Sequence, residues 1–169
     1  MNFCEEQKRE IETIKERIVK LELSDADCER ISRKAGISGL TVSELLENFI
    51  GDLVNGTYSN GSDERDKAYE WYNRCWFANM NNNLLHHLIE CNYNVSDFLE
   101  AYDELQEFEI NPQSFEDEIE LLEDDEQLWF KEDYEKCTGE FLEKNKNIDL
   151  NKEIEICRKW LNEARELKK

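Results

Sequence analysis

The sequence is short of the residues that break helices. Its 169 residues include one proline, Pro112, and six glycines. Proline and glycine are the least favourable residues inside a helix, so little in the chain interrupts helical stretches. Apolar residues make up 39% of the sequence, and a domain of this size can bury roughly 70% of the surface that its unfolded chain exposes. These features together predict a folded, mainly α protein.

Long apolar runs and closely spaced cysteines are also absent. No run approaches the roughly 20 apolar residues of a membrane-spanning helix, and residues 1–6 contain no apolar signal core. We therefore expect a cytoplasmic protein with no membrane segment. The six cysteines form no CxxC pair, which argues against a zinc site and against a disulfide framework. Reduced thiols that pack as small apolar groups are the plainer interpretation.

Signatures of catalysis and of cofactor binding are missing as well. The sequence contains no GxxxxGK[ST], GxGxxG, HExxH or GxSxG pattern. His86 and His87 are adjacent, so on a helix they point about 100° apart and do not readily share a metal ion. Acidic residues are so frequent that no catalytic pair stands out. We expect no enzymatic activity, no cofactor and no metal site.

Basic residues are missing from the middle of the chain. The formal net charge is −20, and residues 75–130 contain 15 acidic residues but no lysine or arginine. Such a charge repels nucleic acids and anionic membranes and attracts basic protein surfaces. The plain interpretation is a solvated helical surface. Solvated helices usually mix charges, however, because glutamate–lysine pairs at four-residue spacing are stabilising. A surface that binds a basic partner is the functional interpretation.

The acidic residues fall on two predicted helices, over 97–108 and 114–137. Helical spacing places the acidic residues of each helix largely on one side, where rows of carboxylates can imitate the phosphates of a nucleic acid. The candidate partner-binding residues are Glu100, Asp103, Glu104, Glu107, Glu116, Asp117, Glu120, Glu123 and Asp124. Further helices are predicted over 63–80, 84–91 and 150–167. Ser96 is the candidate N-cap of the helix over 97–108, and Asp149 is that of the helix over 150–167. The helix over 63–80 carries Trp71, Trp76 and Phe77, which we interpret as core residues.

A short strand and two helices are predicted before this acidic region. Val19, Leu21 and Leu23 alternate with polar residues, which is the period-two signature of a strand. Ser24 is a candidate N-cap for a helix over about 25–35. Thr41 begins a capping box for a helix that runs to about Val54. The turn-rich residues 55–62 follow, so we predict an N-terminal unit over 1–56 and an acidic, aromatic-rich helical domain over 57–169.

The order strand, helix, turn, helix over residues 17–54 resembles the ribbon-helix-helix unit of small dimeric repressors and antitoxins. The resemblance implies a homodimer whose strands pair through Val19, Leu21 and Leu23. It also implies possible DNA or phosphate contacts at Lys20, Thr41 and Ser43. The outward residues Ile18 and Glu22 are unsuited to reading base edges, and residues 1–74 carry 16 acidic and 11 basic residues. We therefore expect dimerisation and no direct DNA binding.

The chain as a whole resembles small proteins of Firmicute mobile elements, some of which are anti-CRISPR inhibitors of type II-A Cas9. The likeness lies mainly in residues 40–54, in residues 58–65 and in the run Cys75-Trp76-Phe77. It implies binding to the Cas9–guide RNA complex in a bacterial host, at a site that target DNA needs. The leading hypothesis is a protein-binding inhibitor that uses an acidic surface. The alternative is a ribbon-helix-helix transcriptional regulator or antitoxin.

Overall fold

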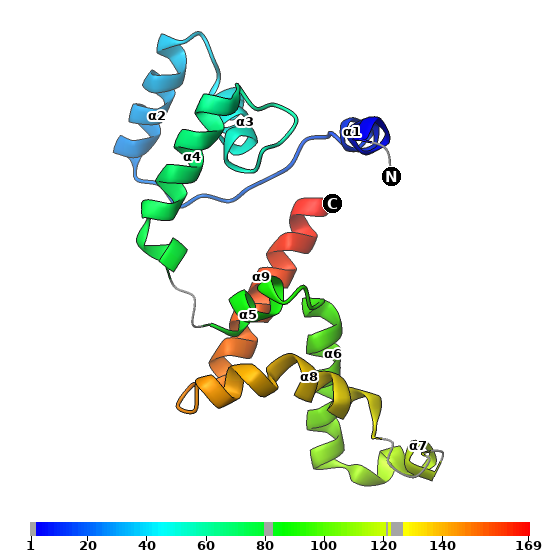
Figure 1. Cartoon of the computed structure of the whole chain (residues 1–169). Helices are drawn as coiled ribbons and strands as arrows, with labels where there is room; N and C mark the ends of the chain where they lie inside the picture. Colours follow the sequence, from blue (N-terminus) through cyan, green and yellow to red (C-terminus); the bar gives the residue numbers. More distant parts are fainter. Residues whose placement is uncertain (1–2, 80–82, 121, 123–126) are drawn as a thin grey trace. The chain divides into compact units, whose positions relative to one another are not determined.

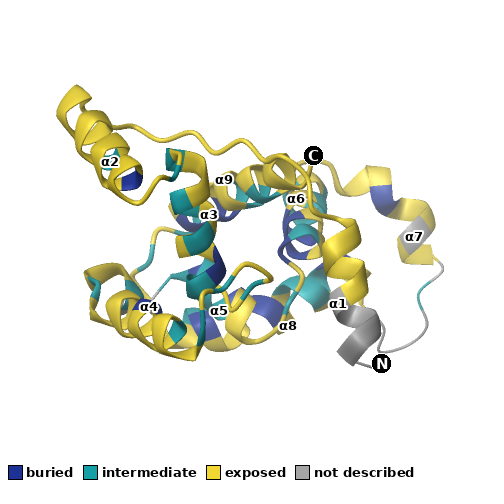
Figure 2. Cartoon of the chain, turned by 90° about the horizontal axis from the view of Figure 1, so that it is seen from above, coloured by how far each residue is buried: buried dark blue, intermediate teal, exposed yellow. Residues whose placement is uncertain are grey.

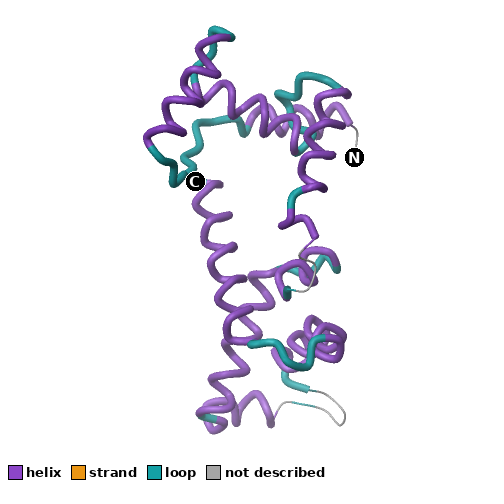
Figure 3. Tube along the Cα trace, turned by 90° about the vertical axis from the view of Figure 1, so that its left-hand side faces the viewer, coloured by secondary structure: helices purple, strands orange, loops and turns teal. Residues whose placement is uncertain are grey.

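A computed structural model describes residues 3–79, 83–120, 122 and 127–169 (Figure 1). The described residues are mainly helical, as predicted, and contain no strand (Figure 3). The chain divides into two compact units, which we call the N-terminal unit (Met1–Asn79) and the C-terminal unit (Met80–Lys169). The division of the sequence after residue 56 remains a prediction. In the structure the boundary between the units lies after residue 79, because the helix after the turn-rich loop (Ser62–Arg74) packs against the helix before that loop (Val42–Leu53).

The N-terminal unit begins with α1 (Phe3–Glu12) and continues with α2 (Asp25–Ile37), α3 (Val42–Leu53), α4 (Ser62–Arg74) and the 3₁₀ turn η1 (Trp76–Asn79). Helix α3 packs against α2 and α4, and α4 packs against η1. The predicted caps of α2 and α3 are confirmed. The Ser24 side chain accepts a hydrogen bond from the Asp27 backbone N–H, and Thr41 and Glu44 form a complete capping box.

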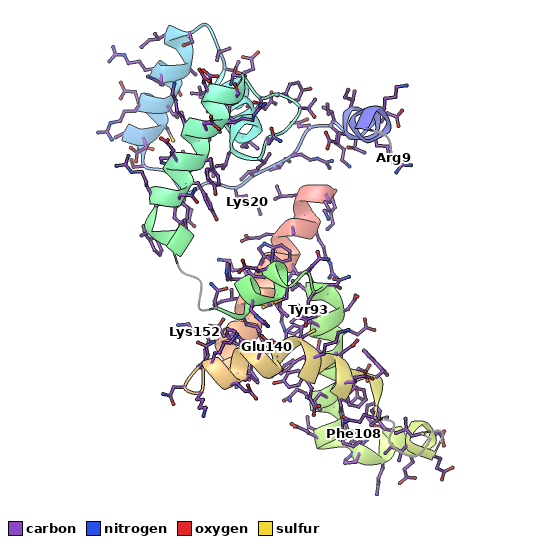
Figure 4. All side chains as sticks on the ribbon, viewed as in Figure 1. Arg9, Lys20, Tyr93, Phe108, Glu140 and Lys152 are labelled. Atoms are coloured by element: carbon purple, nitrogen blue, oxygen red, sulfur yellow. The ribbon has the colours of Figure 1, made fainter. Side chains whose placement is uncertain are left out.

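The predicted strand around Val19, Leu21 and Leu23 is wrong for the chain as the structure describes it. Residues 14–24 lie outside regular secondary structure, and all three apolar side chains are exposed. Lys20 lies on this same connecting segment between α1 and α2 (Figure 4). A strand requires a neighbouring strand that pairs with its backbone N–H and C=O groups. The described part of the chain supplies no such neighbour, so the period-two pattern alone does not produce a strand.

The loop between α3 and α4 is held by two residues of α3, Gly51 and Asp52. Gly51 packs so closely against the loop that an added Cβ would lie 2.8 Å from the Tyr58 backbone carbon. The Asp52 carboxylate accepts hydrogen bonds from the Asn60 backbone N–H at 2.7 Å, from the Asn60 side-chain amide at 2.9 Å and from the Ser59 hydroxyl at 3.1 Å. The turn-rich residues predicted as a separator are therefore an ordered loop tied to the preceding helix.

The C-terminal unit contains α5 (Leu84–Glu90), α6 (Val95–Ile110), the 3₁₀ turn η2 (Pro112–Phe115), α7 (Glu116–Glu120), α8 (Trp129–Lys144) and α9 (Leu150–Lys168). Helix α6 is central, because it packs against α5, α8, α9 and η2. These helices enclose a core of ten buried residues: Leu84, Leu88, Val95, Phe98, Leu99, Tyr102, Cys137, Phe141, Ile154 and Cys157. Such a core is the main stabilising feature of a helical unit of this size.

The predicted continuous helix over 114–137 is wrong. The described residues show instead η2, the short helix α7 and, beginning only at Trp129, helix α8. Leu128 has a non-helical backbone and precedes α8. Both Leu128 and Phe130 are buried in a second core cluster with Ala101 and Phe115. Residues two apart on one helix point in nearly opposite directions, so joint burial favours a helix that starts after Leu128.

The N-caps in the C-terminal unit confirm one prediction and correct another. Asp149 caps α9 as predicted, since its side chain accepts a hydrogen bond from the Lys152 backbone N–H. Ser96 was expected to cap the acidic helix, but Asn94 does so by accepting from the Ser96 backbone N–H at 2.9 Å. The helix therefore begins two residues earlier than the sequence predicts. The Ser96 hydroxyl accepts instead from the Arg165 guanidinium at 2.8 Å.

The two units differ in how many of their apolar residues are buried, and Figure 2 colours each residue by its burial. Among residues 8–78, the buried apolar residues are Ala35 and Ala68. The aromatic residues predicted as core are exposed, with Trp71 at 48%, Phe77 at 41% and Trp76 at 75%. The prediction of a buried aromatic set in this region is therefore wrong. Trp71 lies on α4 and the other two rings lie on η1, and none of the described helices of the N-terminal unit buries them.

None of the helices described in the structure is both long enough and apolar enough to span a membrane.

Candidate functional site

Four acidic residues predicted to bind a partner lie together on α6. Glu100, Asp103 and Glu107 are exposed and Glu104 is half-buried, whereas Phe98, Leu99, Ala101 and Tyr102 of the same helix are buried. At about 100° per residue, the four carboxylates fall within an arc of roughly 100°. We call this set the acidic face. Its position opposite most of the buried side of α6 agrees with the helical spacing of the sequence.

One carboxylate of the acidic face is already paired. The Asp103 carboxylate accepts a hydrogen bond from Arg158 Nη1 at 3.1 Å, and its other oxygen accepts from Arg158 Nη2. This two-point contact raises the pKa of the Arg158 guanidinium above its usual range, mainly through the hydrogen bond to Asp103. Arg158 comes from α9 and is 55 residues away from Asp103 in sequence. The fold therefore brings an arginine side chain to residues 75–130, a segment that has no lysine or arginine of its own.

A second arginine from α9 lies at the edge of the acidic face. Arg165 donates to Ser96 near the start of α6, and together with Arg158 it forms one wall of a shallow groove. The other wall carries Glu100 and Glu104. Both glutamates lack an ion pair within the part of the chain that the structure describes. The groove therefore has an acidic side and a basic side, and Asp103 lies between them.

Three more of the predicted residues lie on α7. Glu116, Asp117 and Glu120 are exposed, and the turn η2 connects them to the end of α6. We call these three residues the acidic tip. Glu123 and Asp124, which were predicted to belong to the same surface, lie outside the described residues. The structure thus places seven of the predicted carboxylates on two neighbouring segments of the C-terminal unit.

The support beneath the acidic tip is aromatic. The rings of Phe108, Phe115 and Phe130 pack on one another at centroid distances of 5.4–5.8 Å. The Lys131 ammonium lies 3.9 Å from the centroid of the Phe108 ring, which is cation–π geometry. Phe108 marks this region of the C-terminal unit in Figure 4. This packing fixes the path of the chain from α6 into α7. It therefore also fixes the position of the acidic tip relative to α6.

The residues considered for phosphate contact are engaged locally. The Thr41 backbone N–H donates to the Glu44 carboxylate at 2.7 Å, and the Thr41 hydroxyl donates to the same carboxylate at 2.8 Å. These bonds lower the pKa of Glu44 below its ordinary value, the backbone bond being the larger cause. A carboxylate already occupies the start of α3, and it opposes a phosphate there through like charge. Ser43 is exposed on the first turn of α3.

Of the cysteines that the structure describes, Cys137 and Cys157 are buried, whereas Cys28 and Cys91 are exposed. Cys91 Sγ lies 3.7 Å from His87 Nδ1. Within the described residues, no three histidine, cysteine, aspartate or glutamate side chains are arranged to hold a metal ion. Burial raises the pKa of Cys137, and it raises that of Cys157 to about 11. A thiol with a raised pKa is a poor nucleophile, because the thiolate is the reactive form. These two cysteines act as apolar core residues.

The two arginines of α9 were not predicted as site residues, and the aromatic residues Trp71, Trp76 and Phe77 were predicted as core residues but are exposed. The spacing of Arg158 and Arg165, seven residues apart on a predicted helix, was the available signal for the arginines. No protein-family model, curated protein or solved structure matches the chain.

Proposed function

We propose that the protein binds a basic protein surface through the acidic face and the acidic tip, and that this binding inhibits the partner. The observation that carries the proposal is the set of exposed carboxylates on a well-packed support. Glu100, Glu104 and Glu107 project from the side of α6 away from its buried residues, and that helix is fixed by the larger core of the C-terminal unit. A rigid acidic surface steers a basic partner and pairs with it without reordering.

The partner that we propose is the Cas9–guide RNA complex, as the resemblance of the sequence implies. Such complexes hold nucleic acid in a positively charged channel and read the PAM with arginines. An acidic surface that occupies that channel would compete with target DNA. The pairing of Asp103 with Arg158 makes the competing surface smaller than the sequence suggests, since it leaves Glu100, Glu104 and Glu107 as the free carboxylates of the acidic face.

The regulator hypothesis gains no support of its own from the structure. A DNA-binding ribbon requires paired strands, and residues 14–24 form none in the described chain. The start of α3, which would hold a phosphate in that hypothesis, is occupied by the Glu44 carboxylate. We therefore propose a binding protein that acts without catalysis, and we do not propose direct recognition of DNA.

The test is a binding measurement with a charge-reversed variant. The variant carries Glu100→Lys, Glu104→Lys and Glu107→Lys, and it leaves Asp103 and its arginine intact. A matched control carries Glu29→Lys, Glu47→Lys and Glu143→Lys, which changes the net charge by the same amount at exposed positions elsewhere. Circular dichroism confirms that both variants keep their helices. Affinity for the purified Cas9–guide complex is then measured by biolayer interferometry, with and without target DNA.

The proposal expects wild type and the matched control to bind, and bound target DNA to compete. It expects the face variant to bind at least about 100-fold more weakly, because each reversal replaces an attraction by a repulsion. A folded face variant that binds as tightly as wild type would refute the acidic surface as the binding site. A wild-type protein that does not bind the complex would refute the choice of partner.

A further inference from the structure

The N-terminal unit leaves its large apolar side chains uncovered. Phe49, on the apolar side of α3, is 42% exposed, and Trp71 and Tyr72 on α4 are 48% and 43% exposed. In the C-terminal unit, by contrast, Phe98 and Phe130 are at most 1% exposed. Large exposed apolar surfaces in proteins mark places where another molecule docks.

The exposed rings form one continuous surface. Phe49 lies 5.4 Å from Trp71 between ring centroids, Trp71 lies 6.2 Å from Phe77, and Phe77 lies 5.5 Å from Tyr72 and 5.9 Å from Trp76. We call these five residues, drawn from α3, α4 and η1, the aromatic face. Tryptophan and tyrosine are the side chains that contribute most to binding at protein interfaces.

Helix α4 carries a regular pattern of charge beside this face. Four of its exposed charged residues, Asp63, Lys67, Glu70 and Arg74, alternate in sign along the helix, and we call them the stripe. The exposed acids Glu64 and Asp66 lie on either side of the stripe. At 100° per residue the four stripe residues fall within an arc of roughly 60°, next to Trp71. In the described part of the chain, none of the four takes part in an ion pair. The stripe therefore lies along the edge of the aromatic face with its charges available.

We propose that the aromatic face docks on the same face of a second copy of this chain, with the two α4 helices antiparallel. Reversing the direction of the stripe reverses its order of signs. Asp63 then faces Arg74 of the second copy, and Lys67 faces Glu70 of the second copy, each pair occurring twice about a twofold axis. A parallel arrangement would place like charges together. Symmetric dimers are self-complementary in this way, and charge patterns of this kind set the orientation of paired helices.

The alternating stripe is what selects a second copy over other partners. A uniformly basic partner would repel Lys67 and Arg74, and a uniformly acidic one would repel Asp63 and Glu70. The stripe of a second copy that runs in the opposite direction places an opposite charge beside each of the four residues. This dimer differs from the one predicted through Val19, Leu21 and Leu23, because it uses α3, α4 and η1 and requires no strand. It also uses residues separate from the acidic face, so it is independent of the proposed partner.

The test is a charge exchange on the full chain, followed by sedimentation velocity. Wild type is expected to sediment as a dimer of about 40 kDa, twice the chain mass of 20.2 kDa. Variant one carries Lys67→Glu and Arg74→Glu, so its stripe is entirely acidic. Variant two carries Asp63→Lys and Glu70→Lys, so its stripe is entirely basic. Each alone is expected to dimerise on the order of 100-fold more weakly, and an equimolar mixture is expected to form the heterodimer.

Recovery of the dimer on mixing separates this proposal from simple misfolding, because misfolded variants would not restore each other. The matched control is Arg33→Glu with Lys34→Glu on α2, which makes the same charge change as variant one at exposed positions and should stay dimeric. A monomeric wild-type protein would overturn the proposal. So would a dimer that survives in both single variants, or one that is lost when Val19, Leu21 and Leu23 are changed to serine but kept in variant one.

Discussion

The Glu153 carboxylate on α9 accepts a hydrogen bond from the Leu84 backbone N–H at the start of α5, at 2.8 Å. Glu153 is 8% exposed, and the Leu84 side chain is fully buried. The first N–H groups of a helix have no partner within the helix, so this carboxylate satisfies a donor that water reaches poorly. It also places a negative charge at the positive end of the helix. The contact joins two helices whose residues lie 69 positions apart.

We predict that Glu153→Ala destabilises the C-terminal unit. Loss of the acceptor leaves the Leu84 N–H buried without a partner, which costs about 1–3 kcal/mol. The control is Glu155→Ala, an exposed glutamate on the same helix, for which a change within about 0.5 kcal/mol is expected. Urea denaturation followed by circular dichroism measures both. Equal stability of the two variants would show that the hydrogen bond contributes little.

A second prediction compares two glycines that have opposite surroundings. In Gly51→Ala the new Cβ would lie 2.8 Å from the Tyr58 backbone carbon and 2.9 Å from its oxygen. The loop must then move, at a cost of about 1–3 kcal/mol. In Gly139→Ala the new Cβ meets no atom within 4 Å in the interior of α8. Alanine there should stabilise by about 0.5–1 kcal/mol. Thermal melts that moved in the same direction for both variants would contradict the described packing.

A third prediction concerns the stability of the N-terminal unit in acid. Hydrogen bonds from the Asn60 side chain and backbone lower the pKa of Asp52 below its ordinary value of 3.8. A carboxyl whose folded pKa is depressed contributes stability above its unfolded pKa and loses it as the pH falls through the folded pKa. We therefore expect the unit to lose stability below about pH 4. NMR titration of the Asp52 carboxyl should give a value below 3.8 in wild type.

The matched variant for this titration is Asn60→Ala. It removes the side-chain hydrogen bond, which is the largest cause of the lowered pKa, and leaves the backbone bond in place. The pKa of Asp52 should rise toward its ordinary value, and the acid sensitivity of the loop should become weaker. An unchanged pKa in this variant would show that the loop does not hold the carboxylate as described.

The features that the sequence predicts well are local. Ser24, the Thr41–Glu44 capping box and Asp149 each act on backbone groups within three residues. These caps can therefore be predicted from residues that are close together in the sequence. The side of α6 that carries Glu100 and Glu107 follows from helical spacing in the same way.

The features that the sequence does not predict depend on distant parts of the fold. The break before α8 follows from the joint burial of Leu128 and Phe130 against Phe115. The absence of a strand around Leu21 follows from the lack of a pairing neighbour in the described chain. Asp103 meets Arg158 only because α9 packs on α6. Charge counted along the sequence therefore overstates how acidic this surface is.

A fourth prediction follows from that contact and rests on the proposed binding function. Arg158→Gln removes the cation that neutralises Asp103 and so returns one carboxylate to the acidic face. Association of oppositely charged surfaces is steered by their fields. The association rate with the basic partner should therefore rise about 2- to 10-fold at low salt and converge with wild type as salt screens the charges.

The control is Lys159→Gln, which makes the same change in net charge at an exposed neighbouring position that has no ion pair in the described chain. Stopped-flow kinetics across a salt series distinguishes the two. If Lys159→Gln accelerates binding as much as Arg158→Gln does, only the total charge matters. If neither variant changes the rate, the surface around Asp103 does not face the partner.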